Sequence, residues 1–202
     1  MPRSPWKPGP ESGFNLIRSS GRPPAWTRRQ TLVAEIVSGV LHTHPRPALA
    51  HGFASSGIAA RISPPFGSGD GGPDGWWIIL EPELHLGEDI VTPDVAGWRR
   101  LAMPEYPRVP IFTPPDRVSE VLSPSAGRID CNEKRTDYGR EGVSRPWFVD
   151  PDARTPEAFE LGGGRWTLPA TLADDAPVSL PPFDAITFLF DALWPPGTPV
   201  SG

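Results

Sequence analysis

The 202-residue chain has one cysteine, two lysines and no apolar run of the length that spans a membrane. A single cysteine, Cys131, cannot form a disulfide within the chain, which is typical of proteins from reducing compartments. A membrane helix needs about 20 consecutive apolar residues, and the opening MPRSPWKPGP lacks the apolar core of a secretory signal. The chain also has no internal repeat, no glycine-rich phosphate loop and no CxxC pair. We therefore expect a cytoplasmic protein with no membrane partner.

The charge balance is mildly acidic, with 19 Lys and Arg against 24 Asp and Glu and a net charge of -5. Non-specific duplex binding relies on many Lys and Arg contacts to phosphate, so this balance argues against a generic nucleic-acid coat protein. It is compatible with an enzyme that holds metal ions in an acidic pocket. The length suits one domain of about 100 to 200 residues with an arm to spare.

Proline and glycine, with 29 and 21 copies, separate the predicted elements from one another. Residues 1–27 show no sustained hydrophobic period, so we predict a Pro-rich arm with little structure of its own. We expect the folded domain over 28–194 and a C-terminal tail over 195–202. Inside the domain, the segment 63–75 has turn chemistry throughout and is predicted to be a mobile loop.

The hydrophobic pattern of the domain alternates between helical and extended stretches. Helical spacing predicts helices over 28–37 and 50–62, and a polar stretch predicts a solvent-facing helix over 127–142. The segments AFEL and RWTL, separated by three glycines, predict a hairpin. Short apolar segments bounded by Pro, Gly or Asp predict strands of one sheet, over 76–86, 89–98, 117–123 and 146–150.

Two carboxylates stand in otherwise apolar strands. Asp94 precedes Val95 and Trp98, and Glu120 precedes Val121. An ionised carboxylate is seldom buried without a partner, because its desolvation is costly. If the two strands are neighbours, the acids face each other, and their repulsion at about 4 Å is roughly 4 kcal/mol for an effective dielectric constant near 20. A divalent cation would remove that repulsion, and oxygen ligands favour magnesium or manganese over zinc.

Such a cation, held by Asp94, Glu120 and the Val121 carbonyl, could polarise a phosphodiester and activate an attacking water. The reaction also needs a nearby ammonium. Lys134 is the only lysine in the predicted domain, where arginine dominates. Lysine can be tuned to give up a proton near neutral pH, whereas arginine cannot. Glu35, on the first predicted helix, could hold a metal-bound water from the opposite side.

At these residues the chain resembles a known family over about 31–194. The matching pieces are VAEIVSGVLHTHPRP, GWWIILEPELHLG, TPDVAGWRR, EVLSPS, RIDCNEKRTDYGREGV and WFVDPDARTPEAFEL. They resemble the Uma-two family of restriction-endonuclease-like proteins, a bacterial group in the PD-(D/E)XK nuclease superfamily. The resemblance implies an α/β fold with a restriction-endonuclease-like core, a central mixed β-sheet flanked by helices, and a metal-dependent phosphodiesterase site.

The resemblance also implies roles for individual residues. It places acidic ligands on Asp94 and Glu120, a helix glutamate on Glu35 and a relocated lysine on Lys134. The superfamily's usual lysine would fall two residues after Glu120, where this chain has Leu122. A second departure is Ser38, which stands where the family usually has an acidic residue before glycine.

Each candidate also has a plain structural interpretation. Asp94 follows a proline and could be a turn residue, and Lys134 could be a solvated helix lysine. Tyr138, four residues after Lys134, could position it or simply pack against the domain. His51, near the start of the second predicted helix, could approach a substrate, although a single histidine is more often structural.

Two functions from different classes remain open. The first is a metal-dependent endonuclease that uses Mg²⁺ or Mn²⁺ to hydrolyse nucleic acid, with DNA the expected substrate. The alternative is a catalytically inactive nuclease-fold protein that acts as a nucleic-acid or protein-binding module, which fits Leu122 and the acidic net charge. The resemblance alone also implies a homodimer.

Overall fold

A computed structural model describes the chain over residues 32–45, 49–122, 127–171 and 177–197. The predicted arm over 1–27 lies outside the described residues, as do the last five residues of the predicted tail. The described residues belong to one unit, 31–202. In this part of the chain, no helix combines the length and the apolar character needed to cross a bilayer.

The centre of the domain is a six-stranded mixed sheet with the strand order β10-β9-β8-β7-β6-β3. Its strands β7 and β8 are parallel, and the other neighbours are antiparallel. The hairpin predicted around the three glycines is confirmed as β9 and β10. The bounds are β3 Trp76–Leu80, β6 Val95–Arg99, β7 Arg117–Val121, β8 Arg145–Asp150, β9 Thr155–Gly162 and β10 Arg165–Thr171.

The prediction of a single sheet is wrong, because four strands form a second sheet in the order β2-β1-β5-β4. The predicted strands over 76–86 and 89–98 each break in two, so that their halves join different sheets. The bounds are β1 Leu32–Val37, β2 Val40–Pro45, β4 Leu84–Leu86 and β5 Asp89–Val91. Short breaks such as Thr92 to Asp94 allow the chain to cross from the small sheet to the large one.

The helix predicted over 28–37 is also wrong, since Leu32–Val37 is strand β1. Ser38 and Gly39 connect it to β2, and both have positive φ angles, 50° and 74°. A two-residue turn with positive φ at both positions matches the twist of a β-hairpin. The β-branched residues of LVAEIV favour a strand, and the turn that follows lets them pair with β2. Hairpin pairing therefore overrides the helical spacing.

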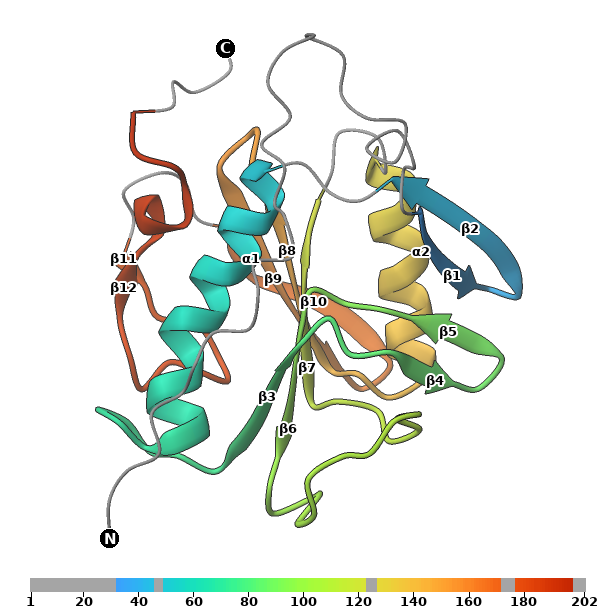
Figure 1. Ribbon diagram of the computed structural model, residues 1–202, viewed down its shortest axis with the longest axis horizontal. Coiled ribbons are helices and arrows are strands. Elements are labelled where there is room, and N and C mark those ends of the chain that lie inside the picture. Colours follow the sequence, from blue (N-terminus) through green and yellow to red (C-terminus); the bar gives the residue numbers. More distant parts are fainter. Residues whose placement is uncertain (1–31, 46–48, 123–126, 172–176, 198–202) are drawn as a thin grey trace, which may run out of the picture. The chain divides into compact units, whose positions relative to one another are not determined.

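Two helices lie against the large sheet (Figure 1). Helix α1, Leu49–Ile62, confirms the helix predicted over 50–62, and it continues into a π-helical turn over Ser63–Ser68 where a loop was predicted. Helix α2, Gly127–Arg140, confirms the third predicted helix. The chain closes with the strand pair β11 Pro177–Val178 and β12 Phe188–Leu189 and a short 3₁₀ turn at Phe190–Leu193.

The large sheet separates two hydrophobic cores. One core joins α1 and the C-terminal segment to one face of the sheet, through residues such as Ile58, Trp147 and Phe183. The other joins the small sheet and α2 to the opposite face, through Trp98 and Tyr138. Because side chains alternate along a strand, Val121 faces the first core whereas Val118 and Glu120 face the second. Helix α2 is therefore not simply solvent-facing, and its inner side can reach Glu120.

Candidate active site

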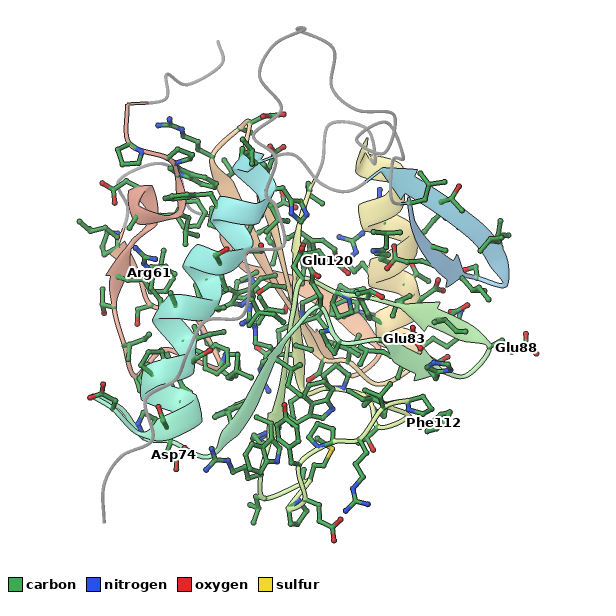
Figure 2. All side chains as sticks on the ribbon, in the orientation of Figure 1. Arg61, Asp74, Glu83, Glu88, Phe112 and Glu120 are labelled. Atoms are coloured by element: carbon green, nitrogen blue, oxygen red, sulfur yellow. The ribbon has the colours of Figure 1, made fainter. Side chains whose placement is uncertain are left out.

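The structure brings together the four side chains predicted to be catalytic, from four separate parts of the chain. Glu35 belongs to β1, Asp94 directly precedes β6, Glu120 belongs to β7 and Lys134 to α2. All four are buried, with exposed fractions between 3% and 7%. Figure 2 shows Glu120 well inside the domain, whereas Glu88 projects from its edge. The sheet crossings of the fold thus produce a buried cluster of charged groups.

Lys134 lies between two of the carboxylates. Its Nζ is 3.0 Å from Glu35 Oε2 and 3.1 Å from Glu35 Oε1. The same atom is 3.5 Å from Glu120 Oε1. Glu35 Oε1 also accepts the backbone N–H of Thr92 at 2.8 Å, which ties β1 to the crossing before Asp94. Glu35 therefore holds Lys134 from the small sheet, and the ammonium points toward the large sheet.

The fold makes Glu120 harder to ionise than an exposed glutamate. The pKa of Glu120 is raised to about 8, chiefly by burial and also by the charges of Asp94 and Glu35. The Lys134 ammonium and the Tyr138 hydroxyl, which donates to Glu120 Oε1, act in the opposite direction. Burial and the neighbouring Glu120 also raise the pKa of the Tyr138 hydroxyl, so this group stays protonated and remains a donor. When Glu120 is ionised, the carboxylates of Glu35, Asp94 and Glu120 face the single ammonium of Lys134, an excess of negative charge that a divalent cation could offset.

Asp94 is anchored through one of its two oxygens. Asp94 Oδ2 accepts the backbone N–H of Val121 at 2.7 Å, a bond that links the start of β6 to the end of β7. The Nε2 atom of His51, from α1, lies 3.3 Å from the same oxygen. Both contacts leave Oδ1 of Asp94 without a hydrogen bond to any described residue.

The two acids share this asymmetry, which makes them suitable cation ligands. Glu120 accepts hydrogen bonds from Tyr138 and Lys134 through Oε1, and its Oε2 accepts none from the described residues. Oxygen donors of this kind are the ligands that Mg²⁺ and Mn²⁺ prefer. The described residues contain no group of three His, Cys, Asp or Glu placed to hold a metal ion by themselves. Waters and substrate oxygens would therefore complete the coordination, as is usual for Mg²⁺. The Val121 carbonyl stays a predicted ligand.

Two contacts of the site were not assigned from the sequence. His51 lies against Asp94, yet nothing in the spacing of AHGFASS distinguishes it from a structural histidine. Tyr138 donates to Glu120, and its position four residues after Lys134 was the available signal, because such residues share a helix face. The fold determines which of these side chains reach the acids.

The departure at Ser38 has a structural explanation. The Ser38 hydroxyl lies 3.0 Å from both carboxylate oxygens of Asp137 on α2. Asp137 is buried and also pairs with Arg140 at 2.7 Å. A second carboxylate at position 38 would repel Asp137, whereas a hydroxyl can donate to it. Serine therefore suits this turn, on the side of α2 that faces the small sheet.

Replacing Tyr138 with phenylalanine is expected to weaken divalent-metal binding about tenfold near pH 7.5. A hydrogen bond to a charged group contributes about 1.5 to 3 kcal/mol, and its loss leaves Glu120 harder to ionise. Because Tyr138 lowers the pKa of Glu120, the substitution raises that pKa further. Calorimetric Mn²⁺ titrations at several pH values should show that the variant needs a higher pH to bind as tightly as the parent. Equal pH profiles would contradict a role for the Tyr138 hydroxyl.

Comparisons with known proteins agree with this fold. A family model described as "Uma2: Putative restriction endonuclease" matches residues 24–190. A solved structure from Anabaena variabilis ATCC 29413, described as "a putative nuclease belonging to DUF820", has a TM-score of 0.63 at 20% identity. The match covers 83% of this chain and 93% of that chain. No curated protein matches the sequence. The mixed sheet with its two helices is thus a restriction-endonuclease-like fold, and the chain belongs to the Uma2 family.

Proposed function

We propose that the protein is a metal-dependent endonuclease that hydrolyses phosphodiester bonds in nucleic acid, with DNA as the expected substrate. The metal would be Mg²⁺ or Mn²⁺, held by Asp94 and Glu120. One observation carries the proposal. Asp94 and Glu120 are both buried beside the paired strands β6 and β7, and each accepts hydrogen bonds through one carboxylate oxygen only. The other oxygen of each acid has no hydrogen bond to a described residue. The Uma2 family supports the same class of activity.

The side chains of the site have different roles in the proposed reaction. Glu35 and Glu120 hold the Lys134 ammonium in place, so that it can stabilise negative charge that develops on a phosphate. Burial strengthens this electrostatic effect, because fewer water molecules screen it. A bound divalent cation would polarise the phosphodiester and favour deprotonation of the attacking water. Glu35 thus acts mainly through Lys134.

The position of Lys134 also accounts for Leu122. Leu122 stands two residues after Glu120, and its backbone N–H donates to Val149 at 2.7 Å. An apolar side chain there supplies no charge to the site. Lys134 approaches Glu120 from α2 instead, so that an ammonium is present although the strand position holds leucine. This placement supports an active enzyme, in contrast to an inactive nuclease-fold protein that acts as a binding module.

Metal binding and cleavage together test the proposal. Purified protein should bind Mn²⁺ in calorimetric titrations and should nick plasmid DNA when Mg²⁺ or Mn²⁺ is present. Excess EDTA should abolish the nicking, and added metal should restore it. A protein that binds no divalent ion and leaves DNA and RNA intact would contradict the proposal and favour the binding module. The homodimer implied by the resemblance stays a prediction, which sedimentation velocity can measure.

A further inference from the structure

His51 approaches the candidate metal site from the side opposite Lys134. It lies in the first turn of α1, and its side chain is 10% exposed. Helices α1 and α2 cover opposite faces of the large sheet (Figure 1). Asp94, at the start of β6, is therefore contacted by His51 from one helix, while Glu120 is contacted by Lys134 and Tyr138 from the other.

The contact between His51 and Asp94 joins an imidazole nitrogen to a carboxylate oxygen. An ionised carboxylate offers only lone pairs, so it attracts an imidazole N–H and repels a bare imidazole nitrogen. Both the Nε2 of His51 and the N–H of Val121 approach the same oxygen, Oδ2, at 3.3 Å and 2.7 Å. With one donor, the carboxylate could still turn about its last bond. A hydrogen bond from the strand and a close imidazole contact from the helix together restrict that rotation.

We propose that His51 is a positioning residue, which fixes the orientation of the Asp94 carboxylate so that Oδ1 would be available to a divalent cation. The inference rests on the proposed function, in which Asp94 and Glu120 bind a divalent cation. The role is indirect, because His51 contacts the oxygen of Asp94 that also accepts the Val121 N–H. Partners of this kind, which orient metal ligands, typically change metal affinity by about 10- to 100-fold when they are removed.

A matched pair of amide substitutions tests this role. In His51→Gln the amide nitrogen takes the place of Nε2, whereas in His51→Asn it takes the place of Nδ1 and cannot reach Asp94. Calorimetric titration with Mn²⁺ alone should show about 10- to 100-fold weaker binding for His51→Asn and His51→Ala. His51→Gln should stay within a few-fold of the parent. Because Gln and Asn carry the same amide group, a general change in polarity would not separate them, and the His51→Ala variant shows the effect of lost packing.

His85 provides a control histidine outside the site. Its Nε2 lies 2.8 Å from Glu83 Oε1, in a more exposed pair formed by β4 and the residue directly before it. His85→Ala should leave Mn²⁺ affinity unchanged. Electron paramagnetic resonance of the bound Mn²⁺ should show no nitrogen coupling, since His51 contacts Asp94 and not the ion. Thermal unfolding of every variant confirms that it is folded.

The outcomes separate the two proposals. If the parent binds Mn²⁺ and Asp94→Asn does not, but all His51 variants bind like the parent, the role of His51 is overturned and the metal site stands. Nitrogen coupling to Mn²⁺ would also overturn it, by making His51 a ligand. If the parent binds no Mn²⁺, or if Asp94→Asn binds as tightly, the proposed function fails and the inference fails with it.

Discussion

Replacing Asp94 with asparagine is expected to lower the rate of metal-dependent cleavage by about a thousandfold or more. The Asn oxygen can still accept the Val121 N–H that Asp94 Oδ2 accepts now. Its amide group then takes the place of Oδ1 and would present N–H donors where a cation needs an acceptor. Metal ions contribute several kcal/mol of charge stabilisation, and each 1.36 kcal/mol of barrier changes the rate about tenfold. Single-turnover cleavage of a labelled DNA duplex measures the effect.

The matched control for this substitution is Asp70→Asn. Asp70 is exposed in the turn after the π-helical segment, and its replacement makes the same change in net charge. The Asp70→Asn variant should cleave DNA at the same rate as the parent at every Mg²⁺ concentration. Thermal unfolding should show both variants folded. Cleavage by Asp94→Asn at the parent rate would show that Asp94 does not hold the metal, and a different site would have to be found.

The two acids of the site could be predicted because charged residues are unusual in apolar strand segments. Asp94 and Glu120 interrupt apolar strands, and a buried carboxylate needs a partner whatever the fold. Their proximity follows from the pairing of β6 with β7, in which Val95 lies opposite Ser119. Lys134 was notable as the one lysine among many arginines of the predicted domain. These residues could therefore be proposed from composition and pattern, together with the family resemblance.

The contacts that connect these residues could not be predicted in the same way. The helical spacing of Leu32–Val37 was misleading, because it is equally compatible with a hairpin strand that pairs with β2. Only the strand places Glu35 on an inner face beside Lys134. The contact of His51 with Asp94 depends on how α1 packs on the sheet, which is a long-range property. Local patterns therefore predict which groups are unusual, and tertiary packing decides which of them meet.

Replacing Glu120 with glutamine is expected to stabilise the metal-free protein, and to do so more at high pH. The folded-state pKa of Glu120 is raised from 4.5 to about 8, chiefly by burial. A raised pKa means that the fold favours the protonated form, so the stability that Glu120 contributes at low pH is lost as the pH rises through about 8. Glutamine resembles the protonated acid at every pH. Since each pKa unit corresponds to about 1.4 kcal/mol, the advantage of the variant should grow by on the order of 4 kcal/mol between pH 5 and pH 9.

Chemical denaturation of both proteins at the two pH values, with EDTA present, measures this difference. Glu88→Gln is the control, because Glu88 is exposed at the turn between β4 and β5 and should show little change with pH (Figure 2). Saturating Mg²⁺ should stabilise the parent by mass action and leave Glu120→Gln unaffected. A variant less stable than the metal-free parent at pH 9 would mean that Lys134 fully compensates Glu120. The site would then be a satisfied ion pair, with no excess negative charge to attract a cation.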